Sequence, residues 1–284
     1  MIEKREQMKT RFNDALEKDT TPSRTLIEEY RKVFREDDFE ASLAVVSYRG
    51  TQVEFDLGVE YSNSPDADDR AVGADVLAQL GWSDRTFLDE SVNVLLRLLR
   101  DPAPYVVYSA AVGFGHRQDR RGIPDLVPLT KHPDALVRLG VVLGLTGHDD
   151  PVAIATLIEL TTDDDKDVRN WALFGIGSQI ELDTPAIREA LFVGLSECDM
   201  EARGEALVGL AQRGDERVID ALLKEWAGTP VSILSIEAAE EMADGRLLPF
   251  LEDFEATRDF PENVYFHECL LAAIDTCRRG RKDM

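Results

Sequence analysis

The chain has 284 residues, of which 55 are acidic and 32 are basic, so its formal net charge at pH 7 is −23. Proteins that bind nucleic acid usually carry a basic surface, so this balance argues against a nucleic-acid partner. It is compatible with a cationic protein partner, and equally with solubility alone. Apolar residues make up 44% of the chain, which is enough for a folded core, and none of their runs is long enough to cross a bilayer.

The start of the chain, residues 1–6, is not followed by the apolar run of a secretory signal. The cysteines Cys198, Cys269 and Cys277 have neither the spacing of a tight pair nor that of a metal site. We therefore expect a reducing, cytoplasmic environment. We also expect no cofactor, no metal and no membrane partner.

Residues 1–50 are predicted to form a helical cap at the N-terminus. Amphipathic patterns cover residues 4–18 and 22–35, and a third helix is expected at 39–48. A cap is needed because the end of a repeat array must cover its apolar face with a polar exterior. The next apolar pattern, residues 52–61, reads as the first helix of the repeats.

A repeated pattern fills residues 51–260. Each copy reads as an acidic loop, an apolar residue, Arg, and small residues three and six positions after the Arg; the clearest copies are residues 137–145 and 168–176. Aligned on the Arg position, the copies fall 31 to 37 residues apart, at Arg70, Val107, Arg138, Arg169, Arg203 and Ser235. Self-similarity at a nearly fixed period is typical of a repeat array.

Each repeat is predicted to be a pair of helices. Between the copies lies a second apolar helix pattern, at residues 91–99, 123–129, 152–160, 187–195 and 218–226. We call this second helix pattern helix A. One unit consists of helix A, a short loop rich in Asp and Pro, and helix B, which carries the Arg. Small residues such as Ala172 and Gly175 would let neighbouring helices approach closely, and the loop aspartates would cap helix B.

The sequence therefore predicts an all-α fold, an α-α superhelix of about six helix-pair repeats with helical end caps. Residues 261–284 form the C-terminal cap, with a helix at 263–279 that lacks the repeated pattern. No linker divides the chain, so we expect the two caps and the array to form one continuous domain.

Residues 147–154 and 167–172 resemble the HEAT-like repeats of bacteria, in the short form also found in phycobilisome lyases. Together with residues 205–210, the second string is similar to the YibA-type bacterial HEAT proteins. The resemblance covers about residues 50–260. It implies a HEAT/armadillo-like solenoid with a right-handed twist, in which the B helices line the concave surface.

The arginines of the repeated pattern are predicted to be structural. Arg138, Arg169 and Arg203 each lie one turn into helix B, near their own acidic loop and that of a neighbouring repeat. Because the guanidinium fork suits carboxylate pairing, we expect these three residues to form a ladder of ion pairs between repeats.

A partner-binding surface is predicted on the outer side of the B helices. Positions one and five after the Arg would face away from the core, and they include large apolar side chains. The positions are Tyr108, Val112, Leu139, Leu143, Asn170, Phe174, Gly204 and Val208, with Ile236 and Glu240 in the last unit. They would form an apolar groove, unless tight curvature covers them with neighbouring B helices.

Trp171 flanks this row, and the equivalent positions downstream are Glu205 and Glu237. A Trp beside acidic residues can hold an Arg or Lys of a partner, although a Trp wedged between repeats is the alternative. We therefore expect a non-enzymatic scaffold that binds a basic partner protein on its concave surface. Its apolar anchors would be Tyr108, Leu139, Trp171 and Phe174, and its charged contacts Glu205 and Glu237. An immunity or antitoxin protein would fit this description.

An enzyme, or a subunit of one, is the alternative that the resemblance to bilin lyases allows. The chain contains no His-Glu-x-x-His, Gly-x-Ser-x-Gly or phosphate-binding Gly-Lys-Thr motif, and His267-Glu268-Cys269 is weak as a metal site. Cys198 is the one cysteine inside the array, next to Asp199. Neighbouring negative charge raises the pKa of a thiol, so we expect Cys198 to be a poor nucleophile.

Overall fold

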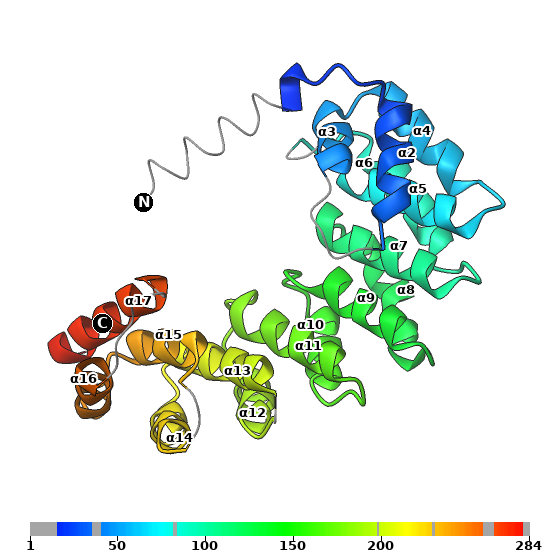
Figure 1. Ribbon diagram of the computed structural model, residues 1–284. Helices are drawn as coiled ribbons and strands as arrows, with labels where there is room; N and C mark the ends of the chain where they lie inside the picture. The colour runs from blue at the N-terminus through cyan, green and yellow to red at the C-terminus, as the bar shows by residue number, and fades with distance from the viewer. Residues whose placement is uncertain are drawn as a thin grey trace. The chain divides into compact units, whose positions relative to one another are not determined.

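The computed structural model describes residues 16–35, 41–81, 84–197, 199–228, 231–257 and 264–280. Throughout these ranges the regular structure is helical, without strands (Figure 1). None of the helices in them combines the length and the apolar character that crossing a membrane requires. The all-α prediction is confirmed.

Contacts divide the chain into two compact units, residues 1–148 and 149–284. We describe each unit by itself. The expectation of one continuous domain stays a prediction.

The first unit begins with the N-terminal cap. The helices α2 (Ser23–Val33) and α3 (Ala41–Arg49) lie close to the predicted 22–35 and 39–48. Most of the helix predicted at 4–18 lies outside the described residues. In α2, the Arg24 guanidinium pairs with Glu60 of the first repeat at 2.7 Å, and the Tyr30 hydroxyl donates to the Asp75 carboxylate at 2.9 Å. The cap is thus tied to the array by polar contacts as well as by its apolar core.

The repeats of the first unit follow as helix pairs. They are α4 (Gln52–Ser62) with α5 (Ala67–Gln79), α6 (Leu88–Leu98) with α7 (Pro104–Arg117), and α8 (Ile123–Leu126) with α9 (Ala135–Leu145). The B helices α5, α7 and α9 pack consecutively on one another. The helix predicted at 123–129 is only one α-helical turn, and the 3₁₀ turn η3 (Val127–Lys131) follows it. Pro128 explains the difference, since it cannot donate the backbone hydrogen bond of a continuing helix.

The second unit has two layers of helices. The B helices α11 (Lys166–Ser178), α13 (Met200–Gln212), α15 (Ile233–Met242) and α17 (Val264–Arg279) pack in a row. The other layer holds α10 (Pro151–Leu160), α12 (Pro185–Gly194), α14 (Arg217–Trp226) and α16 (Leu248–Thr257) (Figure 1). Although α17 lacks the repeated pattern, it packs on α15 as the next member of the B row.

Aspartates of the loops set where the B helices start. The Asp165 side chain accepts hydrogen bonds from the first-turn amides of α11, and Asp199 does the same for α13. Each such cap stabilises the fold by about 1 kcal/mol. These two helices then approach closely, since a Cβ added to Gly209 would lie 2.6 Å from the Gly177 Cα. Glycine at 209 is therefore a packing requirement.

The arginines of the repeated pattern join consecutive repeats. Arg169 on α11 pairs with Glu197 after α12, with 3.0 Å between Nε and Oε1 and 3.2 Å between Nη2 and Oε2. Arg203 on α13 contacts Glu225 of α14 at 2.9 Å. Both also donate to a carbonyl six residues earlier, in the loop before their own helix. Arg138 makes this second contact too, with the His132 carbonyl at 2.9 Å.

Two further arginines, the buried Arg117 and the part-buried Arg213, hold the ends of other helices and were not singled out in the sequence. Arg213 follows α13 and donates to the carbonyls of Ile176, Gly177 and Ile180 at the end of α11, at 2.9, 2.9 and 2.6 Å. In the first unit, Arg117 does the same for Leu77 and Leu80 at the end of α5. Both lie ten positions after the Arg position of their repeat, which is the signal in the sequence that could have found them.

Candidate partner-binding groove

A groove crosses the layer of B helices in the second unit. It encloses about 710 Å³. Its lining residues are Asn170, Trp171, Phe174, Met200, Glu201, Glu205, Val231, Ser232, Ile233, Leu234, Tyr265 and Phe266. We call this the B-face groove. Apolar and aromatic side chains dominate the lining, and two glutamates lie among them.

The aromatic side chains of the groove are accessible. Trp171 is 42% exposed, and its ring meets that of Phe174 edge to face, with 5.5 Å between the centroids and 87° between the planes. Met200 is 44% exposed and Tyr265 is 59% exposed. Trp171 is therefore not wedged between repeats, which was the alternative to a binding role. Its indole offers a face to a ligand.

The groove lies over the first turns of the B helices. Met200 is the first residue of α13, Ile233 is the first of α15, and Tyr265 is the second of α17. Met200 and Ile233 precede the Arg position of their repeats, and Tyr265 lies on a helix without the repeated pattern, so the pattern does not report them. A signal was present all the same, since an apolar residue begins each of these helices where a polar one is usual.

Carboxylates follow one turn further along the same helices. The Glu205 carboxylate on α13 accepts a hydrogen bond of 3.0 Å from the Ser178 hydroxyl. Burial raises the pKa of Glu205 despite this bond, and the charges of Glu237 and Glu201 raise it further. Burial also raises the pKa of Glu237 and of Glu240, and for Glu240 the neighbouring glutamates add to it.

We call Glu205, Glu237 and Glu240 the acidic row. In the described part of the chain, no Lys or Arg forms a salt bridge with any of them. Partly buried carboxylates without a counter-charge are costly in a folded protein, and a cation from outside would relieve that cost.

The predicted binding residues separate into two groups. The structure brings Trp171, Phe174 and Glu205 together in the lining, and Glu237 is close enough to raise the pKa of Glu205. Tyr108 and Leu139 belong to the first unit and do not line this groove. There Tyr108 packs against α9, since a Cβ added to Gly140 would lie 3.1 Å from its Cα.

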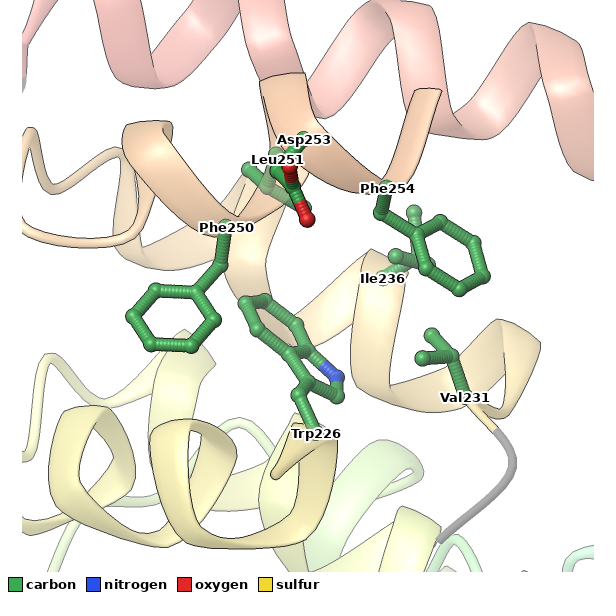
Figure 2. A pocket seen from close by; sticks show the side chains of 7 residues that line it. All are labelled: Trp226, Val231, Ile236, Phe250, Leu251, Asp253 and Phe254. Carbon is green, nitrogen blue, oxygen red and sulfur yellow. The ribbon is translucent and has the colours of Figure 1, made fainter. Parts of the chain in front are cut away.

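The predicted row of outward apolar side chains is wrong at its end. Val208 is 7% exposed and Ile236 is 1% exposed, so both are core residues. Ile236 faces α14 and α16, where it lines a small pocket of about 80 Å³ with Trp226, Phe250 and Phe254 (Figure 2). The offset from the Arg position therefore does not fix which side chains face outward, because Val208 is buried in a repeat that has Arg203 and Ile236 in one that has Ser235. In the latter repeat, the buried Ser235 hydroxyl accepts a hydrogen bond from the Trp226 indole at 3.1 Å.

The cysteines contribute no activated thiol to the described residues. Cys198, the candidate nucleophile of the alternative hypothesis, lies outside them. Burial raises the pKa of the Cys269 thiol, and it raises that of Cys277 to about 11. Across the described ranges, His, Cys, Asp and Glu side chains form no cluster that could hold a metal ion.

The comparison with known proteins agrees with the helix-pair architecture. The family model of HEAT repeats matches residues 92–177 and 155–243. This chain belongs to the HEAT-repeat family. It is 30% identical over 247 residues to protein YibA of Escherichia coli (strain K12), a match that covers 84% of this chain and 85% of that protein.

Solved structures show the same HEAT-repeat fold. The X-ray structure of Escherichia coli YibA is similar with a TM-score of 0.66 and 26% identity, over 95% of this chain and 96% of that one. An engineered protein is similar with a TM-score of 0.53 and 18% identity, over 89% and 79% of the two chains, and shows the fold alone. The chain is thus a bacterial HEAT-like repeat protein of the YibA type, as the sequence predicted.

Proposed function

We propose that this HEAT-repeat protein is a non-enzymatic scaffold that binds a basic partner protein in the B-face groove. One observation carries the proposal: half-exposed aromatic side chains share the groove lining with Glu205, a member of the acidic row that has no basic counterpart in the described residues. An apolar anchor and a buried charge pair are the two features that make an interface residue a hot spot.

Trp171 supplies the strongest expected contact. An aromatic side chain that becomes fully buried at an interface contributes on the order of 2 kcal/mol or more to binding. The indole face also attracts a guanidinium or ammonium group, and the effect grows as the site loses water. Glu205 and Glu237 lie where the same cation could pair with a carboxylate.

The net charge supports the same class of partner. A formal charge of −23 creates a field that draws a basic protein toward the molecule and speeds its association. A scaffold that covers a basic surface by shape and charge would act as an inhibitor of its partner. We therefore include an immunity or antitoxin role in the proposal.

Capture from a lysate of the native organism tests this function. Tagged wild-type protein is incubated at low and at moderate salt beside the variant Trp171→Ala, and bound proteins are identified by mass spectrometry. Trp171 is 42% exposed, so its truncation should leave the fold intact, as circular dichroism can verify. We expect one dominant basic protein that the wild type retains and the variant loses.

A charge-matched control separates the groove from general electrostatics. The double variant Glu90→Gln, Glu181→Gln removes two exposed carboxylates that do not line the groove. It should capture the partner as the wild type does. Equal capture by Trp171→Ala, or a set of captured proteins that is not basic, would contradict the proposal.

A further inference from the structure

We infer that the segment seated in the B-face groove is an amphipathic, basic α-helix of the partner, which lies across α11, α13, α15 and α17. The inference rests on the proposed function and specifies what the groove recognises. Apolar side chains of this helix pack on the aromatic lining, and its Lys or Arg side chains pair with the acidic row.

The direction of the segment follows from the lining. The residues come from the starts of α13, α15 and α17 and from the second and third turns of α11, so the groove runs across the helices. Packed helices lie about 8 to 10 Å apart, so a groove over this row is about 25 to 30 Å long. A helix of about 16 to 20 residues has that length.

The amphipathic character follows from two parallel rows. Glu205 comes five residues after Met200 on α13, and Glu237 comes four residues after Ile233 on α15. On each helix the acidic residue therefore lies about one turn, roughly 6 to 8 Å, beyond the apolar one. A partner that fits both rows must present a line of apolar side chains beside a line of basic ones.

Backbone chemistry favours a helix over an extended strand. An extended segment exposes its N–H and C=O groups and needs a sheet edge or polar side chains to satisfy them. Two uncharged polar side chains of the lining are already engaged: the Ser232 hydroxyl caps α15 at 3.0 Å from the Ser235 amide, and the Asn170 amide contacts Glu201 at 3.5 Å. The first-turn amides of α13 are capped by Asp199. A helix brings its own backbone hydrogen bonds.

The spacing of the acidic row predicts the spacing of the basic residues. Glu205 and Glu237 belong to adjacent B helices, about 8 to 10 Å apart. At about 1.5 Å per residue, basic side chains seven positions apart are about 10 Å apart along the helix axis and fall on one side of an α-helix, so they can reach successive carboxylates.

A designed peptide tests the inference. The probe is a fluorescein-labelled peptide of about 18 residues, made of Leu, Ala and Lys, with Leu on one helical stripe and Lys beside it. A second peptide has the same charge but carries two central prolines, which break the helix. Fluorescence anisotropy at moderate salt measures binding, and circular dichroism reports whether the bound peptide gains helix.

We expect the helical peptide to bind, and the proline peptide to bind at least about tenfold more weakly. The double variant Glu205→Gln, Glu237→Gln should weaken binding of the helical peptide by about tenfold, whereas Glu90→Gln, Glu181→Gln should not change it. Glutamine at 205 can still accept the hydrogen bond from Ser178, so the variant keeps that contact.

Equal affinity for the two peptides would contradict the inference that the bound segment is a helix, but it would not contradict the proposed function. The inference would also be overturned if the helical peptide bound the Trp171→Ala variant and the Glu205→Gln, Glu237→Gln double variant as tightly as it binds the wild type. The lysate capture with Trp171→Ala decides the proposed function separately.

Discussion

The Ser178 hydroxyl on α11 donates a hydrogen bond of 3.0 Å to the Glu205 carboxylate on α13. This contact fixes a partly buried carboxylate at the side of the B-face groove. Burial nevertheless raises the pKa of Glu205, as do the neighbouring Glu237 and Glu201. The free protein therefore keeps negative charge in the groove at a cost in stability, and a cationic partner would relieve that cost.

Removing this charge should stabilise the free protein. The pKa of Glu205 in the folded protein lies above its ordinary value, so the folded state binds a proton more tightly than the unfolded state does. The wild-type free energy of unfolding therefore falls as the pH rises from the unfolded-state pKa to the folded-state pKa. Glu205→Gln should raise the free energy of unfolding at pH 7 by about 0.5 kcal/mol or more. Urea denaturation at pH 4 and pH 7 measures this gain, which should be larger at pH 7. A loss of stability at pH 7 would contradict it.

Partner binding should weaken in mild acid. The pKa of each member of the acidic row is raised, so these carboxylates gain protons at a higher pH than ordinary glutamates do. Affinity for the captured partner should therefore fall as pH falls, by about tenfold for each tightly paired carboxylate that is lost. Titration by calorimetry from pH 7 down to pH 5 measures it. The double variant Glu205→Gln, Glu237→Gln should bind weakly with a flatter pH profile.

Arg213 should contribute more to stability than the arginines of the repeated pattern. It donates to carbonyls at the end of α11, and partial burial lowers its pKa, an effect that the charge of Asp183 offsets only in part. Arg213→Met would leave these carbonyls without donors, at a cost of about 2 to 4 kcal/mol. Arg169→Met removes the ion pair with Glu197 and hydrogen bonds to the loop carbonyls of Asp163 and Asp164, and it should cost about 1 kcal/mol. Chemical denaturation compares the two, and the reverse order would contradict this account.

The contact between α11 and α13 should not tolerate a side chain at Gly209. An added Cβ would lie 2.6 Å from the Gly177 Cα, which belongs to backbone and cannot rotate away. Gly209→Val should therefore destabilise the second unit by about 2 kcal/mol or more. Gly228→Ala is the matched control, because a Cβ there meets no atom within 4 Å, and it should be nearly neutral. Thermal unfolding of both variants decides the point.

The carboxyl of Asp75 should make the first unit less stable at neutral pH. Burial raises its pKa to about 6, although hydrogen bonds from Tyr30 and Ser109 act in the opposite direction. The wild-type free energy of unfolding should fall as pH rises from about 4 to 6. Asp75→Asn keeps an acceptor for Tyr30 and should gain about 2 kcal/mol at pH 7 and little at pH 4. An equal gain in the free energy of unfolding at pH 4 and pH 7 would show that the pKa of Asp75 is not raised.

Most of the fold follows from the repeated pattern. The helical period, the loop aspartates and the small residues together predict where the helix pairs lie. The helices α10, α12 and α14 begin and end within two residues of their predicted ranges. Pro128 shortens α8, which is a local cause, whereas the burial of Val208 and Ile236 depends on how the helices pack. The helix α16 carries no repeated pattern and was not predicted.

The binding site was predictable only in part. Trp171, Phe174 and Glu205 were found because they keep a fixed offset from the repeated Arg. Tyr265 lines the same groove but comes from α17, which lies outside the pattern, and its proximity to Leu234 depends on how α15 and α17 pack. Side-chain neighbours from helices without the pattern cannot be derived from its period.

Site-specific photo-crosslinking in the native cells tests the central claim most directly. A benzophenone amino acid replaces Met200, which lines the groove and is 44% exposed, and in a second variant it replaces Leu182, which is 45% exposed and lies outside the lining. Our account predicts that position 200 crosslinks to one basic protein, through a segment that is helical and rich in Lys or Arg, and that position 182 does not. Crosslinking of the same protein from position 182 and not from position 200 would contradict it.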